Sequence, residues 1–404
     1  MVAALSEAGT MAILSVNAGS STLKFSIHPL RDGEVQASLL TGSIQGLEPG
    51  GTPDMGWTLN GQRGRRSLEA SDAPFTAALA GLRELLEGET GIPAIEAVSH
   101  RVVHGGRDFR DSVIVTNDIL ARLSRLDSLA PLHQPHNVAG IRAFREAFPA
   151  LPQIACFDTA FHADLPEVVS RFALPRALHD DGVRRYGFHG LSYQYIMGTL
   201  QQHSPRANGR VLMAHLGNGA SLCAAVDGRS QATTMGFSAL DGLMMGTRSG
   251  ALDAGVLLYL MEQGWDHDRL QSLLYRQSGL LGVSGLSADM RRLRADAGTA
   301  AREAVELFTY RVVREAGAMA ACIGGLDLIA FSGGIGEHDA TLRADVCAAL
   351  AWMGVRVDGA SNAAATGDAV QRIDSEDGGI EVWVVPTDEG RVAAQAAAAL
   401  IAAR

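Results

Sequence analysis

Three short glycine-rich segments hold residue types that could act on a phosphate group. They are NAGSS at residues 17–21, HLGNGA at 215–220 and SGGIGEH at 332–338. A turn of glycine and serine presents backbone N–H groups and hydroxyls in a concave array, which suits phosphate oxygens. None is a Walker loop, and no G-x-G-x-x-G follows a strand and opens a helix. An ordinary β-turn is the alternative for each of the first two segments, but three such corners favour a nucleotide site.

Lys24 follows the first segment and is the only lysine of the chain, so that 33 of the 34 basic residues are arginine (34 − 1). A compact ammonium on a flexible stem can approach a phosphate within a tight hairpin where a planar guanidinium is too bulky. We therefore expect Lys24 to contact phosphate. Chance survival of one lysine is the alternative.

Two arginines stand in apolar, glycine-rich surroundings: Arg101 in SHRVVHGG and Arg248 in GLMMGTRSG. A buried arginine is costly unless it is paired, and no carboxylate lies beside either one in sequence. An anionic substrate is the natural partner, and a long-range ion pair is the alternative.

Some histidines and acids are spaced four apart, as in His100 and His104 or Asp158 and His162. Zinc ligands at this spacing need a helix, whereas HRVVHGG has the pattern of a strand that ends in glycines. No HExxH motif occurs. We do not expect a zinc site.

The composition of the chain argues against several classes of binding partner and indicates a cellular compartment. A formal net charge of −10 argues against a nucleic acid or an anionic membrane, since these are held mainly by clustered positive charge. The four cysteines lie far apart, as in proteins of a reducing cytosol. The N-terminal MVAALSEAGTM lacks the features of a signal peptide, and no window of about 18 residues is apolar enough to span a bilayer. We expect a cytoplasmic protein.

Two of the corners lie in similar hairpins. The strands are predicted at 12–16 and 23–27 around the first corner, and at 211–214 and 222–226 around the second. Aligned without gaps, the two copies superimpose Asn17 on His215, Gly19 on Gly217 and Ser20 on Asn218. The chain is also longer than one usual core. These features suggest a duplicated α/β domain with a glycine-rich hairpin in each half, the two corners forming a cleft.

Other segments have clear local patterns. Asn60-Gly61 predicts a tight hairpin turn. Apolar periodicity and glycine or proline boundaries predict helices at 73–91, after Pro135, at 298–325 and after Thr387, with a buried strand leading into the glycine turn at 332–338.

Together these segments resemble the acetate and propionate kinase family, within the actin, sugar kinase and heat-shock ATPase superfamily. The resemblance rests on NAGSSTLKFS, HRVVHGG, LAPLHQPHN, FDTAFH, VRRYGFHG, HLGNGAS, TTMGFSALDGLMMGTRSG, SGLLGVSGLSADMR, FSGGIGEHD and VVPTDEG, which run in family order from about residue 11 to 391.

The resemblance implies an α/β fold of duplicated ribonuclease H-like (actin-like ATPase) domains with a nucleotide cleft between them. The N-terminal domain would comprise 11–158 and 392–404, and the C-terminal domain, with the nucleotide site, 159–391. The implied activity is reversible phosphorylation of acetate or another short carboxylate by ATP, giving an acyl phosphate and ADP. Mg²⁺ or Mn²⁺ is the implied cofactor and a homodimer the implied assembly.

Site residues are carried over by motif. Asp158, His189 and Arg248 would be catalytic, and Asn17 and Glu389 would hold the metal. Arg101 would bind the carboxylate, and the acyl group would be surrounded by Val103, Leu132, Phe188 and Ala239. The nucleotide would meet Lys24, His215, Leu216, Gly217, Asn218, Gly219, Asp289, Met290, Arg291, Gly334, Ile335, Gly336, Glu337 and His338.

Elementary chemistry agrees with these roles. A carboxylate nucleophile is already ionised at pH 7, so alignment and charge neutralisation suffice and no general base is needed. Asp158 is therefore better interpreted as a residue that positions other groups or the metal than as a proton acceptor.

The chain departs from the family pattern at several positions. Thr22 replaces a usual serine, Leu191 and Tyr193 replace threonine and histidine, Ala232 replaces aspartate, Ala239 replaces a proline of the acyl pocket, and His338 replaces asparagine. These changes leave phosphoryl transfer intact but bear on the choice of acyl chain.

Three alternatives remain. A propionate kinase is the nearest, followed by a non-catalytic nucleotide sensor, since this fold also serves binding roles. The presence of Arg101, His189, Arg248 and Glu389 argues against the sensor. A metal-dependent hydrolase is the third.

Overall fold

The computed structural model describes residues 11–48, 50–69 and 73–403. The N-terminal segment considered as a signal peptide lies outside them, apart from Met11. No helix in the described ranges is long and apolar enough to cross a membrane.

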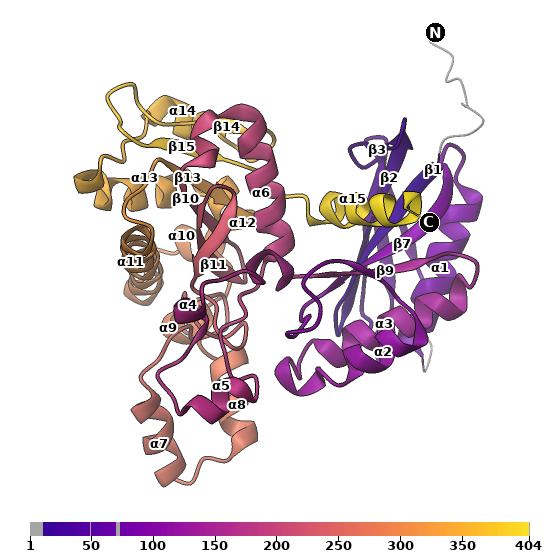
Figure 1. Cartoon of the computed structure of the whole chain (residues 1–404), viewed down its shortest axis with the longest axis horizontal. Helices are drawn as coiled ribbons and strands as arrows, with labels where there is room; N and C mark the ends of the chain where they lie inside the picture. Colours follow the sequence, from indigo (N-terminus) through magenta and orange to yellow (C-terminus); the bar gives the residue numbers. More distant parts are fainter. Residues whose placement is uncertain (1–10, 49, 70–72, 404) are drawn as a thin grey trace. The chain divides into compact units, whose positions relative to one another are not determined.

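The described residues form two compact units (Figure 1). The first takes its residues from Met1–Ala160 and Asp388–Arg404, and the second is Phe161–Thr387. The chain passes from one unit to the other after Ala160 and after Thr387, whereas the sequence analysis placed the domain boundaries after 158 and 391.

The first unit is built on one mixed sheet with the strand order β6-β5-β4-β2-β1-β7-β9-β8, to which β3 adds beside β2. The strands are β1 (Met11–Ala18), β2 (Thr22–Arg31), β3 (Glu34–Val35), β4 (Leu40–Gln45), β5 (Asp54–Leu59), β6 (Gln62–Ser67), β7 (Ala94–Val102), β8 (Val113–Ile114) and β9 (Gln153–Phe157). The helices are α1 (Pro74–Gly88), α2 (Asn117–Ser124), α3 (Gln134–Ala147) and α15 (Glu389–Ala402), with a 3₁₀ turn at Asp127–Leu129.

The second unit contains a smaller sheet with the order β12-β11-β10-β13-β15-β14. Its strands are β10 (Arg210–Leu216), β11 (Ala220–Val226), β12 (Arg229–Thr233), β13 (Leu328–Ser332), β14 (Gln371–Arg372) and β15 (Glu381–Val384). Its helices are α4 (Glu167–Ser170), α5 (Arg176–Asp180), α6 (Gly190–His203), α7 (Ala254–Glu262), α8 (His267–Arg276), α9 (Gly279–Ser284), α10 (Met290–Ala295), α11 (Thr299–Cys322), α12 (Gly333–His338), α13 (Ala340–Ala349) and α14 (Gly359–Ala364). Three 3₁₀ turns lie at Ala160–His162, Pro205–Asn208 and Ala351–Met353.

Five strands of each sheet share one topology. In β4-β2-β1-β7-β9 and in β12-β11-β10-β13-β15, the first two pairings are antiparallel and the last two are parallel. This repetition confirms the predicted duplicated α/β fold.

The turns of the two hairpins differ in length by one residue. Ala18 pairs with Leu23 across the first corner, whereas Leu216 pairs with Ala220 across the second. The ungapped alignment is therefore right for β1 and β10 but fails beyond the corner. Lys24, which pairs with Asn17, corresponds to Ser221, which pairs with His215.

The alternation of residues along β1 explains the layers of the first unit. Leu14 and Val16 belong to a buried apolar cluster together with residues of α1 and α3. The intervening Ser15 is buried on the opposite face, where its hydroxyl bonds Ser99 Oγ and donates to the carbonyl of Gly390 in α15, both at 2.7 Å. Figure 1 shows α15, the C-terminal helix, lying beside β7 within this unit.

Two local predictions can be compared with the structure. Asn60 and Gly61 both have positive φ (49° and 82°), which confirms the hairpin turn between β5 and β6. At 333–338 the sequence predicted a glycine turn, but only Gly333 has positive φ (75°) and the segment forms helix α12. The Glu337 carboxylate accepts from the Gly333 amide at 2.8 Å and so closes a helical turn that the glycines alone would not favour.

The start of α15 packs so closely on the β1–β2 hairpin that only glycine fits at position 390. A methyl group there would lie 2.5 Å from Ser26 Oγ, which is itself hydrogen-bonded to His28 Nε2. We predict that Gly390→Ala lowers the free energy of unfolding by about 1 to 3 kcal/mol, because overpacking forces neighbours out of place.

The matched control is Gly198→Ala in α6, where an added methyl meets nothing within 4 Å. This change should stabilise by about 0.5 to 1 kcal/mol, because alanine is the better helix former. Thermal unfolding followed by circular dichroism compares the two. Equal effects of the same sign would contradict the packing argument.

Candidate active site

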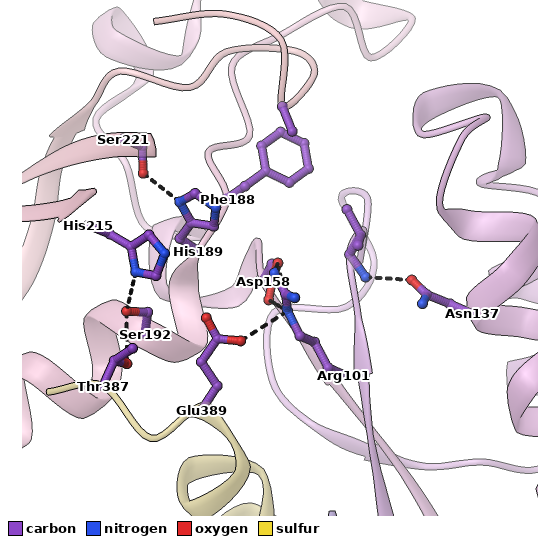
Figure 2. Close-up of polar contacts among 12 residues, drawn as sticks. Arg101, Asn137, Asp158, Phe188, His189, Ser192, His215, Ser221, Thr387 and Glu389 are labelled. Carbon is purple, nitrogen blue, oxygen red and sulfur yellow. Dashed lines mark hydrogen bonds and ion pairs between the residues drawn. The ribbon is translucent and has the colours of Figure 1, made fainter. Parts of the chain in front are cut away.

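Arg101, Asp158 and Glu389 form one charged group in the first unit (Figure 2). Arg101 lies near the carboxyl end of β7 and Asp158 directly follows β9. Because these strands are parallel, both residues come to the same edge of the sheet. The guanidinium donates from Nη2 to Asp158 Oδ2 at 2.6 Å and from Nε to Oδ1 at 3.0 Å. Glu389 Oε2 lies 3.3 Å from Nε.

This geometry gives Arg101 the long-range ion pair that the sequence analysis left as an alternative. Burial would lower the pKa of the guanidinium, but attraction to Asp158 and then Glu389 raises it above its usual value. Both carboxylates contact Nε or Nη2. Among the described residues, Nη1 makes no hydrogen bond, so its two N–H groups can bind a further anion.

Glu389 owes its place to the first turn of α15. Asp388 caps this helix by accepting from the Arg391 amide at 2.9 Å. The Ser15 hydroxyl holds the carbonyl of Gly390. The C-terminal helix thus delivers a carboxylate to a sheet formed by the N-terminal part of the chain.

The backbone amide of Val103 is held by Asn137 of α3, which is labelled in Figure 2. The Asn137 side chain accepts from the Val103 amide and donates to the carbonyl of Ala18, both at 2.9 Å. Asn137 was not among the site residues predicted from the sequence, although it belongs to the LAPLHQPHN motif. Leu132, predicted for the acyl pocket, is half-buried just before α3.

Asn17 is half-buried near the end of β1, and Lys24 is its partner on β2. Lys24 is therefore on a strand beyond the corner and not within the tight turn. Its side chain is exposed and lines a hollow of about 560 Å³ with Arg63 and Arg65 of β6, Trp57 of β5 and several hydroxyl groups. Three basic side chains thus line the hollow, of which Arg65 is paired with Asp54 at 3.0 Å.

In the second unit, His189 occupies an unusual backbone position just before α6. Its φ of 59° and ψ of 24° are left-handed, a conformation that costs a residue other than glycine about 1 to 3 kcal/mol and is common at functional sites. The ring lies against that of His215 at a centroid distance of 4.3 Å, with the two planes tilted by 33°. Its Nδ1 lies 2.8 Å from Ser221 Oγ (Figure 2).

Gly219 brings His189 and Arg248 to one corner. A methyl group at Gly219 would lie 3.3 Å from His189 Nε2 and 3.9 Å from Arg248 Nη1. Arg248 Nη1 also donates to the carbonyl of Ala239 at 2.9 Å. The hairpin corner, the histidine and the arginine predicted from separate motifs thus meet within this unit, next to Ala239.

Two other histidines are held by hydroxyl groups or carbonyls. His215 Nδ1 lies 2.8 Å from Ser192 Oγ, which accepts from Thr387 Oγ1 at 3.0 Å (Figure 2). His162 donates from Nε2 to the carbonyl of Phe188 at 3.0 Å, and burial lowers its pKa to about 4. Neutral His162 therefore fixes the backbone just before His189.

Helix α12 begins beside the Gly217–Gly219 corner. The closeness is shown by Gly333, where an added methyl group would lie 2.7 Å from the carbonyl of Leu216. Glu337 turns inward, where its carboxylate accepts from the amides of Gly333 and Thr387. The buried Arg343 donates to the carbonyls of Gly336 and Glu337.

The remaining nucleotide candidates form a separate local structure at the start of α10. Asp289 caps this helix through the Arg291 amide at 2.9 Å and also pairs with the Arg291 side chain at 2.7 Å. The hydrogen bond from Arg291 lowers the pKa of Asp289. Met290, which stands between these two residues in the sequence, is buried.

The described residues contain no cluster of three or more His, Cys, Asp or Glu side chains that could hold a metal ion. Asn17 and Glu389 offer an amide and a carboxylate oxygen. Mg²⁺ prefers such donors and often takes only one or two of them, completing its shell with water and substrate phosphates. By donor type, each of the two side chains suits an ion held jointly with a nucleotide.

Comparison with known proteins gives a consistent result. A profile of the acetokinase family matches residues 12–395. The chain is 49% identical over 383 residues to an acetate kinase of Rhodopseudomonas palustris, covering 93% of this chain and 95% of that protein.

Two solved structures are also similar. A propionate kinase of Francisella tularensis has a TM-score of 0.88 at 34% identity, covering 96% of this chain and 98% of the other. An acetate kinase of Porphyromonas gingivalis has a TM-score of 0.87 at 34% identity, covering 97% of this chain and 100% of the other. The match over nearly the whole length, with the repeated sheet topology, confirms the resemblance seen in the sequence: the chain belongs to the acetokinase family.

Proposed function

We propose that this chain is an acetate kinase, which transfers the γ-phosphoryl group of ATP to acetate, giving acetyl phosphate and ADP, and catalyses the reverse reaction. The observation that carries the proposal is the Arg101 guanidinium, held by two carboxylates with Nη1 making no hydrogen bond among the described residues, in a chain of this family. Cytoplasmic ATP would be the donor.

The first unit would handle the acceptor. Arg101 Nη1 donates to one oxygen of acetate, and the other oxygen attacks the γ-phosphorus as the bond to the β,γ-bridging oxygen breaks. The electron pair of that bond leaves with ADP. No proton moves, because acetate is already ionised, and Asp158 acts by orienting Arg101.

The second unit would handle the donor. His189 and Arg248, together at Gly219, would donate hydrogen bonds to the phosphoryl oxygens as charge spreads over them. The Gly217–Gly219 corner, α12 and the start of α10 would hold the nucleotide, and Lys24 would meet its phosphates. Mg²⁺, held by Asn17 and Glu389, would neutralise phosphate charge when bound.

A homodimer is the proposed assembly. Helix α7 has no buried residue within its own unit, and Val256, Leu258, Tyr259 and Met261 are exposed on it. Such an apolar surface suits a second copy of the chain. We expect the wild type to sediment at twice the chain mass and Leu258→Glu to shift it toward the monomer, whereas a monomeric wild type would contradict the assembly.

Propionate kinase activity is the second candidate, and Ala239 is the observation that favours it. By the family resemblance, a proline ring would wall the acyl pocket at this position, and the smaller alanine would leave room for about one more methylene.

We predict that His189→Ala and Arg248→Ala each lower kcat about 10²- to 10³-fold and leave the KM for acetate nearly unchanged. The reason is that a preorganised donor aimed at developing charge typically supplies about 2.7 to 4 kcal/mol. Steady-state kinetics with a coupled ADP assay measure both constants. His203→Ala, at the exposed end of α6, is the matched control and should behave as wild type. A raised KM with an intact kcat would show that the two residues only bind substrate.

For the acyl pocket, we predict ADP release with acetate, a similar kcat/KM for propionate and a lower value for butyrate. One methylene changes discrimination by only about 1 to 3 kcal/mol. Ala239→Pro should restore preference for acetate. Rejection of propionate by more than about a hundredfold in the wild type would refute the role of Ala239, and no ADP release with any of the three acids would refute the proposed function.

A further inference from the structure

Behind His189 lies a chain of two hydroxyl groups. Tyr193 of α6 is fully buried, and its Oη lies 2.5 Å from Ser221 Oγ on β11. Ser221 Oγ lies 2.8 Å from Nδ1 of His189. Ser221 is also fully buried.

The direction of the hydrogen bond between Tyr193 and Ser221 follows from the protonation of the buried phenol. Burial, the largest cause, raises the pKa of Tyr193 well above its usual value, so the phenol keeps its proton at neutral pH. The contacts with Ser221 and with the His215 backbone act in the opposite direction but do not outweigh burial. Among the described residues, Ser221 Oγ is the acceptor within reach of the phenol proton.

The direction of the second hydrogen bond, between Ser221 and His189, follows from the first. Since Ser221 Oγ accepts from Tyr193, its single O–H donates to His189 Nδ1. An imidazole nitrogen that accepts a hydrogen bond carries no proton, so in the neutral ring the proton resides on Nε2. Nε2 is the nitrogen at the Gly219 corner. The reverse order would leave the buried phenol proton without an acceptor, which is unfavourable.

We propose that Tyr193 and Ser221 are positioning residues that fix His189 as the Nε2–H tautomer, so that a neutral ring donates a hydrogen bond toward the phosphoryl group. The inference rests on the proposed phosphoryl transfer for its purpose. The left-handed backbone of His189 sets where the ring lies, and the two hydroxyls set which nitrogen donates.

Nitrogen NMR of the full chain carrying ¹⁵N-histidine tests the tautomer without any assay of activity. His189→Gln identifies the His189 resonances. In the wild type near pH 7.5 we expect an unprotonated Nδ1 and a protonated Nε2. Ser221→Ala should convert this pattern to a mixture of tautomers, Ser221→Thr should retain it, and Tyr193→Phe should weaken it. Tyr195→Phe, on the same helix, is the matched control and should change nothing.

A wild-type His189 protonated at Nδ1, or resonances unaffected by Ser221→Ala in a folded variant, would overturn the proposal. Kinetics give the second readout: Tyr193→Phe and Ser221→Ala should lower kcat about 10- to 100-fold, as loss of a partner that fixes a histidine does, with the KM for ATP and acetate little changed. A wild type with the expected resonances but no kinase activity would refute the proposed function and not the tautomer assignment.

Discussion

The ion pair between Arg101 and Asp158 is the interaction on which the acceptor half of the proposed site depends. A guanidinium half-buried at the end of β7 would be costly alone, and the bidentate contact with Asp158 offsets that cost while fixing the plane of the guanidinium. The pair exists because β7 and β9 are parallel neighbours. Glu389 joins it only because α15 packs against β1 and β7 through Ser15 and Gly390.

The duplicated sheet gives each unit the same positions, and the sequence uses them for different chemistry. Lys24 and Ser221 are equivalent by register, yet one is an exposed cation beside basic side chains and the other a buried hydroxyl behind His189. In the five-strand order that the two sheets share, the fourth strand is β7 in the first unit and β13 in the second. Arg101 lies near the end of β7, whereas Gly333 follows β13 and begins α12.

Local patterns in the sequence predicted the duplicated fold, the Asn60-Gly61 turn and the family, because each depends on residues close in the chain. Three features could not be predicted in this way. The one-residue difference in loop length between the hairpins depends on the pairing register of their strands. The partners of Arg101 come from a strand end and a helix that are distant in sequence. The course of α12 depends on the side chains of Glu337 and Arg343. Asn137 and the Tyr193–Ser221 contact were missed for the same reason, although the histidine-to-tyrosine change was a visible signal. The roles of the site residues stay predictions.

The central claim is that Asp158 acts through Arg101 and not as a proton acceptor. A double-mutant cycle of Arg101→Leu and Asp158→Asn, measured as kcat/KM for acetate, tests it most directly. If Asp158 serves only to orient Arg101, its replacement costs little once Arg101 is gone, and the coupling should exceed about 2 kcal/mol. If the two losses instead multiply, Asp158 makes its own contribution to the reaction, which contradicts a purely orienting role.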